Sequence, residues 1–196
     1  MMNQIDLFPL PLVLFPGGRL PLQIFEKRYL DMIRLCLKED KGFGVVMIES
    51  GDQVIKDDDQ ASPNIAQVGS YCKVVDFNLQ NNGLLQITLE ARCKFKILSL
   101  DENADRLLQA KVEYIKPEAD FPIPEGQKHL GELLSAFLQH TSLEGSDIKP
   151  ESAFDLGARL TELLPCANYV KQELLELSDP LLRLEMLEDQ IAKLQE

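Results

Sequence analysis

The amino-acid sequence predicts an α+β fold, in which an antiparallel β-barrel-type subdomain with one helix is followed by an all-α helical bundle. Apolar and polar residues alternate with a period of two along several segments of the first part of the chain, as half-buried strands require. The period changes to that of helices near the C-terminus, and a proline-containing stretch separates the two patterns. We therefore expect a barrel-type subdomain at residues 1–118, a linker at 119–126 and a helical subdomain at 127–196.

A strongly apolar segment, residues 8–29, opens the first subdomain and carries prolines at positions 9, 11, 16 and 21. Proline fixes the backbone dihedral φ and lacks an N–H donor, so neither a regular helix nor a central strand can run through this segment. We expect short extended runs at residues 5–8 and 20–25, joined by a kinked loop that wraps around the core.

A single helix is expected at residues 26–38, because apolar side chains recur there at intervals of three and four residues. This apolar stripe consists of Tyr29, Leu30, Ile33, Cys36 and Leu37. Residues 43–48 follow two glycines and are rich in β-branched side chains, which favours a buried strand. The loop at 50–64 contains Asp57, Asp58 and Asp59, which lack the spacing of a calcium loop and favour solvated acids over a cation site.

Further strands are expected at residues 66–79, 84–90, 92–100 and 108–114, with an Asn-Gly turn near residues 81–83 that favours a tight hairpin. Their clean alternation indicates a sheet with one packed face and one wet face. Closing such a sheet into a barrel would remove its exposed edges.

Helices are expected after the linker, at residues 129–140, 151–164, 168–177 and 180–195. Asp179 and Pro180 have the residue types of an N-cap and a first helical position. The last helix repeats Leu184, Leu187, Ile191 and Leu194 with coiled-coil-like spacing. Because the repeat is short, we expect this helix to dock onto its own bundle rather than to dimerise.

Several blocks of the sequence, taken together and in order, resemble one known family. They are FPLPLVLFPG at 8–17, LPLQIFEKRY at 20–29, FGVV at 43–46, VG at 68–69, VDF at 75–77, GLLQITLE at 83–90, FKIL at 95–98, LTELLP at 160–165 and KQELLEL at 171–177. The chain is similar over nearly its whole length to the N-terminal, substrate-binding domain of Lon proteases.

The resemblance implies a PUA-like barrel followed by helices, and a function in holding polypeptides. The ATPase and Ser-Lys peptidase modules of Lon proteases have no counterpart in the chain, which also lacks a phosphate-binding Gly-x-x-x-x-Gly-Lys-Ser/Thr loop. No catalytic residue can therefore be transferred. We expect a non-catalytic, stand-alone interaction module without cofactor or metal, an adaptor in protein quality control, with unfolded polypeptides and a separate ATP-dependent protease as partners.

Charge, cysteine content and the lack of long apolar runs argue against several classes of function and cellular location. The net charge of −12, most of it in residues 119–196, repels phosphate backbones and argues against nucleic-acid binding. The four cysteines are scattered without a C-x-x-C pair, which predicts neither a zinc site nor a disulfide framework. The chain shows no secretory signal and no membrane-length apolar run, so we expect a cytoplasmic bacterial protein, monomeric or weakly dimeric.

The candidate polypeptide-binding residues lie in the proline-rich loop. Leu10, Leu12, Leu14 and Phe15 form more apolar surface than a loop normally exposes. Two interpretations stay open: these side chains close one end of the barrel, which the pattern favours, or they form an exposed groove for apolar segments of other polypeptides.

The alternative function is RNA binding, because PUA-like folds include RNA-binding proteins. Lys73, Arg92, Lys94 and Lys96 would then form a basic stripe on the wet face of the barrel. The negative net charge and the scarcity of aromatic residues among these lysines favour the polypeptide-binding interpretation.

Overall fold

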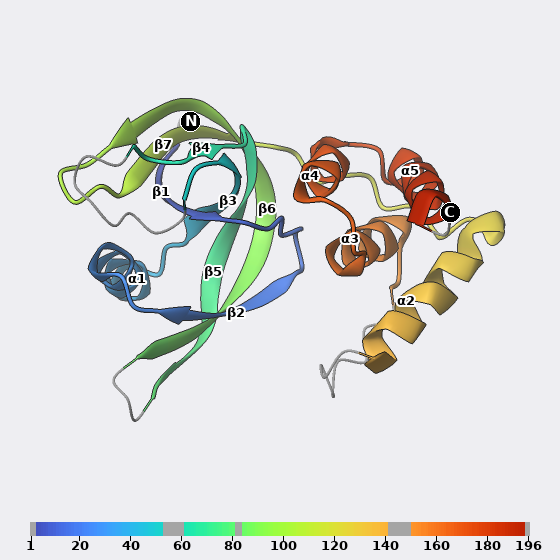
Figure 1. Ribbon diagram of the computed structural model, residues 1–196, viewed down its shortest axis with the longest axis horizontal. Coiled ribbons are helices and arrows are strands. Elements are labelled where there is room, and N and C mark those ends of the chain that lie inside the picture. Colours follow the sequence, from blue (N-terminus) through green and yellow to red (C-terminus); the bar gives the residue numbers. More distant parts are fainter. Residues whose placement is uncertain (1–2, 53–60, 81–83, 141–149, 195–196) are drawn as a thin grey trace. The chain divides into compact units, whose positions relative to one another are not determined.

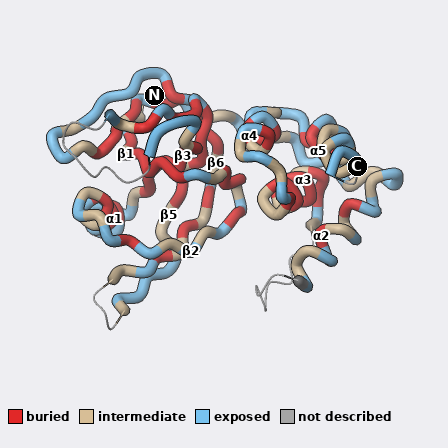
Figure 2. Tube along the Cα trace, viewed as in Figure 1, coloured by how far each residue is buried: buried red, intermediate tan, exposed pale blue. Residues whose placement is uncertain are grey.

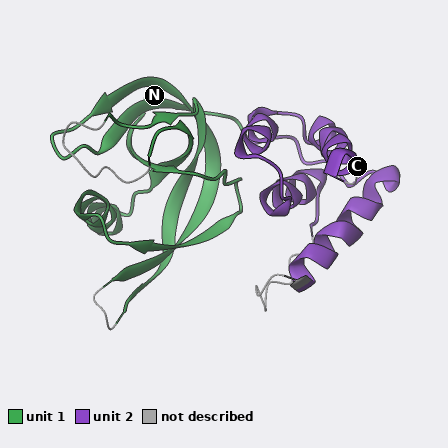
Figure 3. Ribbon diagram, in the orientation of Figure 1, with its two compact units in different colours: residues 1–116 green, residues 117–196 purple. Residues whose placement is uncertain are grey.

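The computed structural model describes residues 3–52, 61–80, 84–140 and 150–194. The chain divides into two compact units, residues 1–116 and residues 117–196 (Figure 3). The fold mixes helices with a large, mainly antiparallel sheet, in agreement with the predicted class. The predicted Asn-Gly turn and the Asp57–Asp59 acids lie outside the described residues.

The first unit contains the sheet and one helix (Figure 1). Its elements are β1 (Asn3–Leu10), β2 (Arg19–Ile24), α1 (Lys27–Glu39), β3 (Phe43–Ser50), β4 (Asn64–Ile65), β5 (Val68–Leu79), β6 (Leu85–Glu102) and β7 (Leu108–Tyr114). The pairings run β1–β7–β6–β5–β3, and β3 also pairs with β1, so the ladder returns to the strand where it started.

The pairing of β1 with β3 is parallel, and this corrects the expectation of a purely antiparallel sheet. Its register runs from Leu7 opposite Gly44 to Leu10 opposite Met47. The helix α1 lies between these two strands in the sequence, and such a long connection permits a parallel pair.

One long strand, β6, replaces the two strands predicted at 84–90 and 92–100. The alternation changes phase near Ala91, which the sequence alone suggests as a chain reversal. The ladder instead absorbs the change with a bulge, since the register with β5 shifts between Tyr71 and Cys72. Ala91 keeps its backbone paired, accepting from the Gly17 N–H at 2.8 Å.

The core of the first unit lies inside the ring of strands and beneath α1 (Figure 2). The helix contributes the buried side chains Tyr29, Met32, Ile33 and Cys36, while Leu37 of the predicted stripe is exposed. Gly42 allows the chain leaving α1 to cross β5 closely, because a Cβ at this position would lie 2.0 Å from the Cys72 carbonyl oxygen.

The regular elements described in the second unit are all helical: a short 3₁₀ turn η1 (Glu125–Gln127), α2 (Lys128–His140), α3 (Ala153–Leu163), α4 (Asn168–Glu176) and α5 (Pro180–Leu194). Helix α3 begins after Ser152, whose Oγ accepts from the Asp155 N–H at 3.2 Å. The Leu181 N–H donates to Asp179 Oδ1 at 2.9 Å, as expected for an N-cap. Leu184 and Leu187 are buried, whereas Leu194 is exposed.

Candidate functional site

The proline-rich loop is mostly part of the core of the first unit. Leu10, Leu14 and Phe15 are buried, and Leu12 is half-buried against the same core. The Leu14 carbonyl oxygen also accepts a hydrogen bond from the buried Ser70 hydroxyl. These positions agree with the interpretation that the loop closes the core, and they leave little of its apolar surface for a partner.

The four basic residues do not form a continuous stripe. Lys94 is 4% exposed, which corrects its expected position on a wet face. Lys73 is half-buried and its Nζ lies 3.0 Å from Asp40 Oδ1, while Arg92 pairs with Glu90 at 2.6 Å. Lys96 is exposed. The burial of one member and the pairing of two others leave a weak basic surface for a polyanion.

Exposed apolar side chains gather instead where β5 and β6 run past the core, and we call this part of the sheet the β5–β6 arm (Figure 1). It comprises residues 74–80, residues 84–89 and β2, which pairs with β6 along the same stretch. Two rows cross the arm, Leu22–Ile87–Phe77 and Ile24–Leu85–Leu79. Directly paired residues share one face of a sheet, so all six side chains lie on the same apolar face.

The opposite face of the β5–β6 arm is polar and hydrogen-bonded across all three strands. Gln80 donates from Nε2 to Gln86 at 2.9 Å and accepts from Gln23 at 3.1 Å. Closer to the core, Arg19 donates to Glu90 at 2.9 Å. The backbone pairings set the register of the three strands, and these side-chain contacts join the strands on the polar face.

The apolar face is mostly covered where β2 and β6 form it and open where β5 forms it. Ile24 and Ile87 are 2% and 1% exposed, and they belong to the core cluster that also contains side chains of α1. Phe77 and Leu79 are 59% and 69% exposed. We call the set Leu22, Phe77, Leu79 and Leu85 the apolar shelf; it continues the apolar surface of the core to the exposed β5 edge of the arm.

The sequence pattern around Phe77 predicts an apolar face on this strand, but it does not predict that the face is exposed. Phe77 and Leu79 alternate with Asp76 and Asn78 as in any half-buried strand. Periodicity shows that such side chains share a face, but it cannot show whether another element covers that face.

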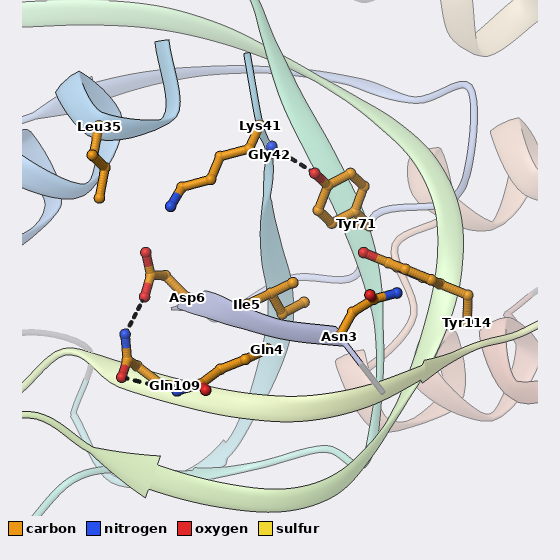
Figure 4. A pocket seen from close by; sticks show the side chains of 10 residues that line it. All are labelled: Asn3, Gln4, Ile5, Asp6, Leu35, Lys41, Gly42, Tyr71, Gln109 and Tyr114. Atoms are coloured by element: carbon orange, nitrogen blue, oxygen red, sulfur yellow. Dashed lines mark hydrogen bonds between the residues drawn. The ribbon is translucent and has the colours of Figure 1, made fainter. Parts of the chain in front are cut away.

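A cavity of about 430 Å³ opens elsewhere in the first unit, where the first residues of β1 diverge from β3 (Figure 4). It is lined by Asn3, Gln4, Ile5, Asp6, Leu35, Lys41, Gly42, Tyr71, Gln109 and Tyr114. The Asp6 carboxylate accepts from Gln109 at 2.6 Å, and the Tyr71 hydroxyl accepts from the Gly42 N–H at 2.6 Å. These polar groups largely bind one another.

The pKa shifts in and near this cavity do not indicate a catalytic group. Burial, with Tyr71 adding to it, raises the pKa of Tyr114 to about 12, so its phenol stays protonated at neutral pH. A hydrogen bond to Glu39 raises the pKa of Lys41. Burial raises the pKa of the nearby Cys36 thiol, which does not line the cavity, to about 11 and makes it a poor nucleophile. No cluster suited to a metal ion occurs among the residues that the structure describes.

None of the helices described is long and apolar enough to cross a membrane.

Sequence comparison finds two groups of relatives. The chain is 26% identical over 110 residues to protein cereblon of Gallus gallus, covering 56% of this chain and 23% of that protein. It is 25% identical over 157 residues to the Lon protease of Anaeromyxobacter dehalogenans, covering 80% of this chain and 17% of that protein. The match therefore spans less than a quarter of the length of either of these two relatives.

Two solved structures with the same fold are Lon N-terminal domains. The Lon N-terminal domain protein from Xanthomonas campestris superposes with a TM-score of 0.77 at 29% identity, covering 95% of this chain and 98% of that one. The N-terminal domain of the Mycobacterium avium complex Lon protease shares the fold, with a TM-score of 0.63 at 16% identity over 95% of this chain and 97% of that one. The family model for the substrate-binding domain of the ATP-dependent protease La (LON) matches residues 4–193, so the chain belongs to the Lon substrate-binding domain family.

Proposed function

We propose that this chain is a non-catalytic module that binds unfolded segments of other polypeptides, and that the apolar shelf is its binding surface. The observation that carries the proposal is the exposure of Phe77 and Leu79 on a three-stranded, hydrogen-bonded arm. An exposed apolar surface of this kind commonly marks an interaction site. Membership in a family defined by substrate binding supports the same function.

The expected affinity is low. Burying one large apolar side chain stabilises a complex by about 1.5–3 kcal/mol, and association has to offset lost translational and rotational freedom. The two most exposed shelf side chains supply about 3–6 kcal/mol before that cost is subtracted, so we expect a dissociation constant of about 100 µM or higher. Binding of this strength is tolerant of sequence, which suits recognition of unfolded chains.

The proposal extends to the role of the module. We propose that it acts as an adaptor, presenting bound polypeptides to a separate ATP-dependent protease, and that its closed ring of strands is a PUA-like barrel with a helical bundle after it. Co-purification of an ATP-dependent protease with the tagged protein from a native lysate, lost on addition of excess unfolded polypeptide, would support the adaptor role.

The binding surface is tested with a permanently unfolded probe, fluorescently labelled lysozyme that has been reduced and amidomethylated. Fluorescence anisotropy should show saturable binding to the native protein. The double variant Phe77→Ser/Leu79→Ser should weaken binding at least about 10-fold, because it removes most of the exposed apolar area of the shelf.

The matched control is Asn78→Ser, which alters the polar face of the same strand and should leave binding unchanged. Equal binding by the wild-type protein and the double variant would exclude the apolar shelf as the site. No binding of the probe by the wild-type protein would contradict the proposed function itself.

A further inference from the structure

Among the residues that the structure describes, no strand pairs with the outer edge of β5 along the β5–β6 arm. Strand β3 pairs with β5 only from Ser70 to Cys72, and beyond Cys72 the described strands pair with β5 only on the β6 side. An unpaired edge presents a row of backbone donors and acceptors that can bind another extended chain. This open edge runs alongside the apolar shelf.

The hydrogen-bond pattern identifies which residues point outward. The Gln80 N–H donates to the Leu84 carbonyl oxygen at 2.9 Å, which makes these two residues a hydrogen-bonded pair. Hydrogen-bonded and non-hydrogen-bonded pairs alternate along an antiparallel ladder. Leu79 and Phe77, one and three positions before Gln80, therefore fall in non-hydrogen-bonded pairs, whose N–H and C=O groups point away from β6.

The other edge of the β5–β6 arm is protected. Strand β2 pairs with β6 on one side, and Pro21 in its middle has no N–H to offer a further strand. The outer part of β5 contains no proline between Val74 and Gln80. Of the two edges of the arm, as far as its residues are described, the β5 edge is the one that keeps a full set of backbone donors next to exposed apolar side chains.

We propose that an extended segment of the bound polypeptide adds to the sheet as a strand along the outer edge of β5, hydrogen-bonding to the backbone of Phe77 and Leu79. Its alternate apolar side chains then extend the apolar shelf by one more strand. This inference rests on the proposed function and adds the binding mode, main-chain pairing, and the substrate class, segments with alternating apolar residues in an extended conformation.

The acidic charge near the β5 edge favours some bound polypeptide segments over others. Asp76 is exposed on the pairing stretch, which has no basic residue between Val74 and Gln80, and residues 1–118 carry 17 acidic against 14 basic side chains. A second copy of this chain would therefore meet like charge, whereas segments flanked by Lys or Arg, or free of charge, would be attracted or indifferent. We assign the edge to an uncharged or basic segment of a different, unfolded polypeptide.

A pair of synthetic peptides tests the main-chain pairing. The first is a labelled ten-residue peptide of alternating valine and threonine with a lysine at each end. The second has the same side chains but N-methyl groups on three successive central residues, which removes donors on both edges of the strand. Loss of these hydrogen bonds should weaken binding at least about 10-fold in fluorescence anisotropy.

Two substitutions at one position test the same point from the protein side. Leu79→Ala keeps the outward N–H and removes the apolar side chain, whereas Leu79→Pro removes both without breaking a bond to β6. We expect Leu79→Pro to bind the first peptide at least about 5-fold more weakly than Leu79→Ala. Far-ultraviolet circular dichroism checks that both variants are folded. If the proline variant is unfolded, the comparison of the two peptides tests strand addition by itself.

The outcomes separate this inference from the proposed function. If both peptides bind equally and the unfolded probe still binds, polypeptide binding stands and strand addition is overturned. If neither the peptides nor the probe binds, both are overturned. If sedimentation velocity shows that the wild-type protein self-associates through this edge and Leu79→Pro is monomeric, the occupant is a second copy and the assignment is wrong.

Discussion

Arg183 is fully buried in the second unit and is held by several partners. Its two terminal nitrogens donate to the Glu118 carboxylate at 2.7 and 2.6 Å, and its Nε donates to the Leu174 carbonyl oxygen at 2.8 Å. A buried charge of this kind is tolerated only while it is paired. The segment around Glu118, close to the predicted linker, is thereby tied to helix α5.

Removing one partner of this pair should be costly. We expect Glu118→Ala to lower the free energy of unfolding by about 3–5 kcal/mol, because it leaves the Arg183 charge buried without its carboxylate. Urea unfolding followed by circular dichroism measures the change. Glu125→Ala serves as the control, since the pair of Glu125 with Lys128 is exposed and should matter by less than about 1 kcal/mol.

Gly42 provides a second prediction at the scale of one residue. A methyl group at this position would clash with the backbone carbonyl oxygen of Cys72 and with the side-chain ring of Tyr71, both in β5. We expect Gly42→Ala to destabilise the protein by about 1–3 kcal/mol, as overpacking does. Gly126→Ala, where nothing lies within 4 Å of the new methyl group, should change the thermal midpoint little.

At the scale of an element, helix α1 docks on the sheet through a buried aromatic residue. Tyr29 is 4% exposed and its ring lies 4.1 Å from that of Phe8 in β1. Burial raises the pKa of Tyr29 to about 12. The folded protein therefore keeps the phenol protonated at a pH where the unfolded chain has already ionised it.

This difference in pKa means that the stability contributed by Tyr29 decreases at alkaline pH. Its contribution is fully present below pH 10, the pKa of an unfolded tyrosine, and is lost as the pH rises to about 12. We expect the free energy of unfolding to fall by about 2–3 kcal/mol over this range from Tyr29 alone. Tyr29→Phe should show a smaller fall in urea titrations between pH 9 and 11; an unchanged slope would show that Tyr29 is not the group responsible.

At the scale of the whole molecule, the net charge of −12 should make the association rate depend on the charge of the unfolded polypeptide. Such a field accelerates encounters with basic polypeptides and is screened by salt. We expect the association rate with unfolded lysozyme, a basic chain, to fall several-fold between about 10 mM and 150 mM salt. The rate with unfolded α-lactalbumin, an acidic chain, should rise or stay level; stopped-flow fluorescence measures both rates.

Much of the fold could be predicted from local pattern. The strand predicted at 108–114 is β7 itself, and the helix expected at 26–38 is α1 shifted by one residue, because period and end signals are local properties. The bulge in β6 could not be predicted, since it depends on pairing with β5 and β2. The two-residue strand β4 is too short to carry a period.

The sequence by itself determined the family, most of the helices and strands along the chain, and the apolar character of the proline-rich loop and of the residues near 77 and 79. Only the tertiary structure decided that Phe15 is buried and that Phe77 and Leu79 are exposed. The physical reason is that exposure depends on what covers a side chain. Ile24 and Ile87 of the β5–β6 arm belong to the core cluster that contains side chains of α1, whereas Phe77 and Leu79 lie outside that cluster.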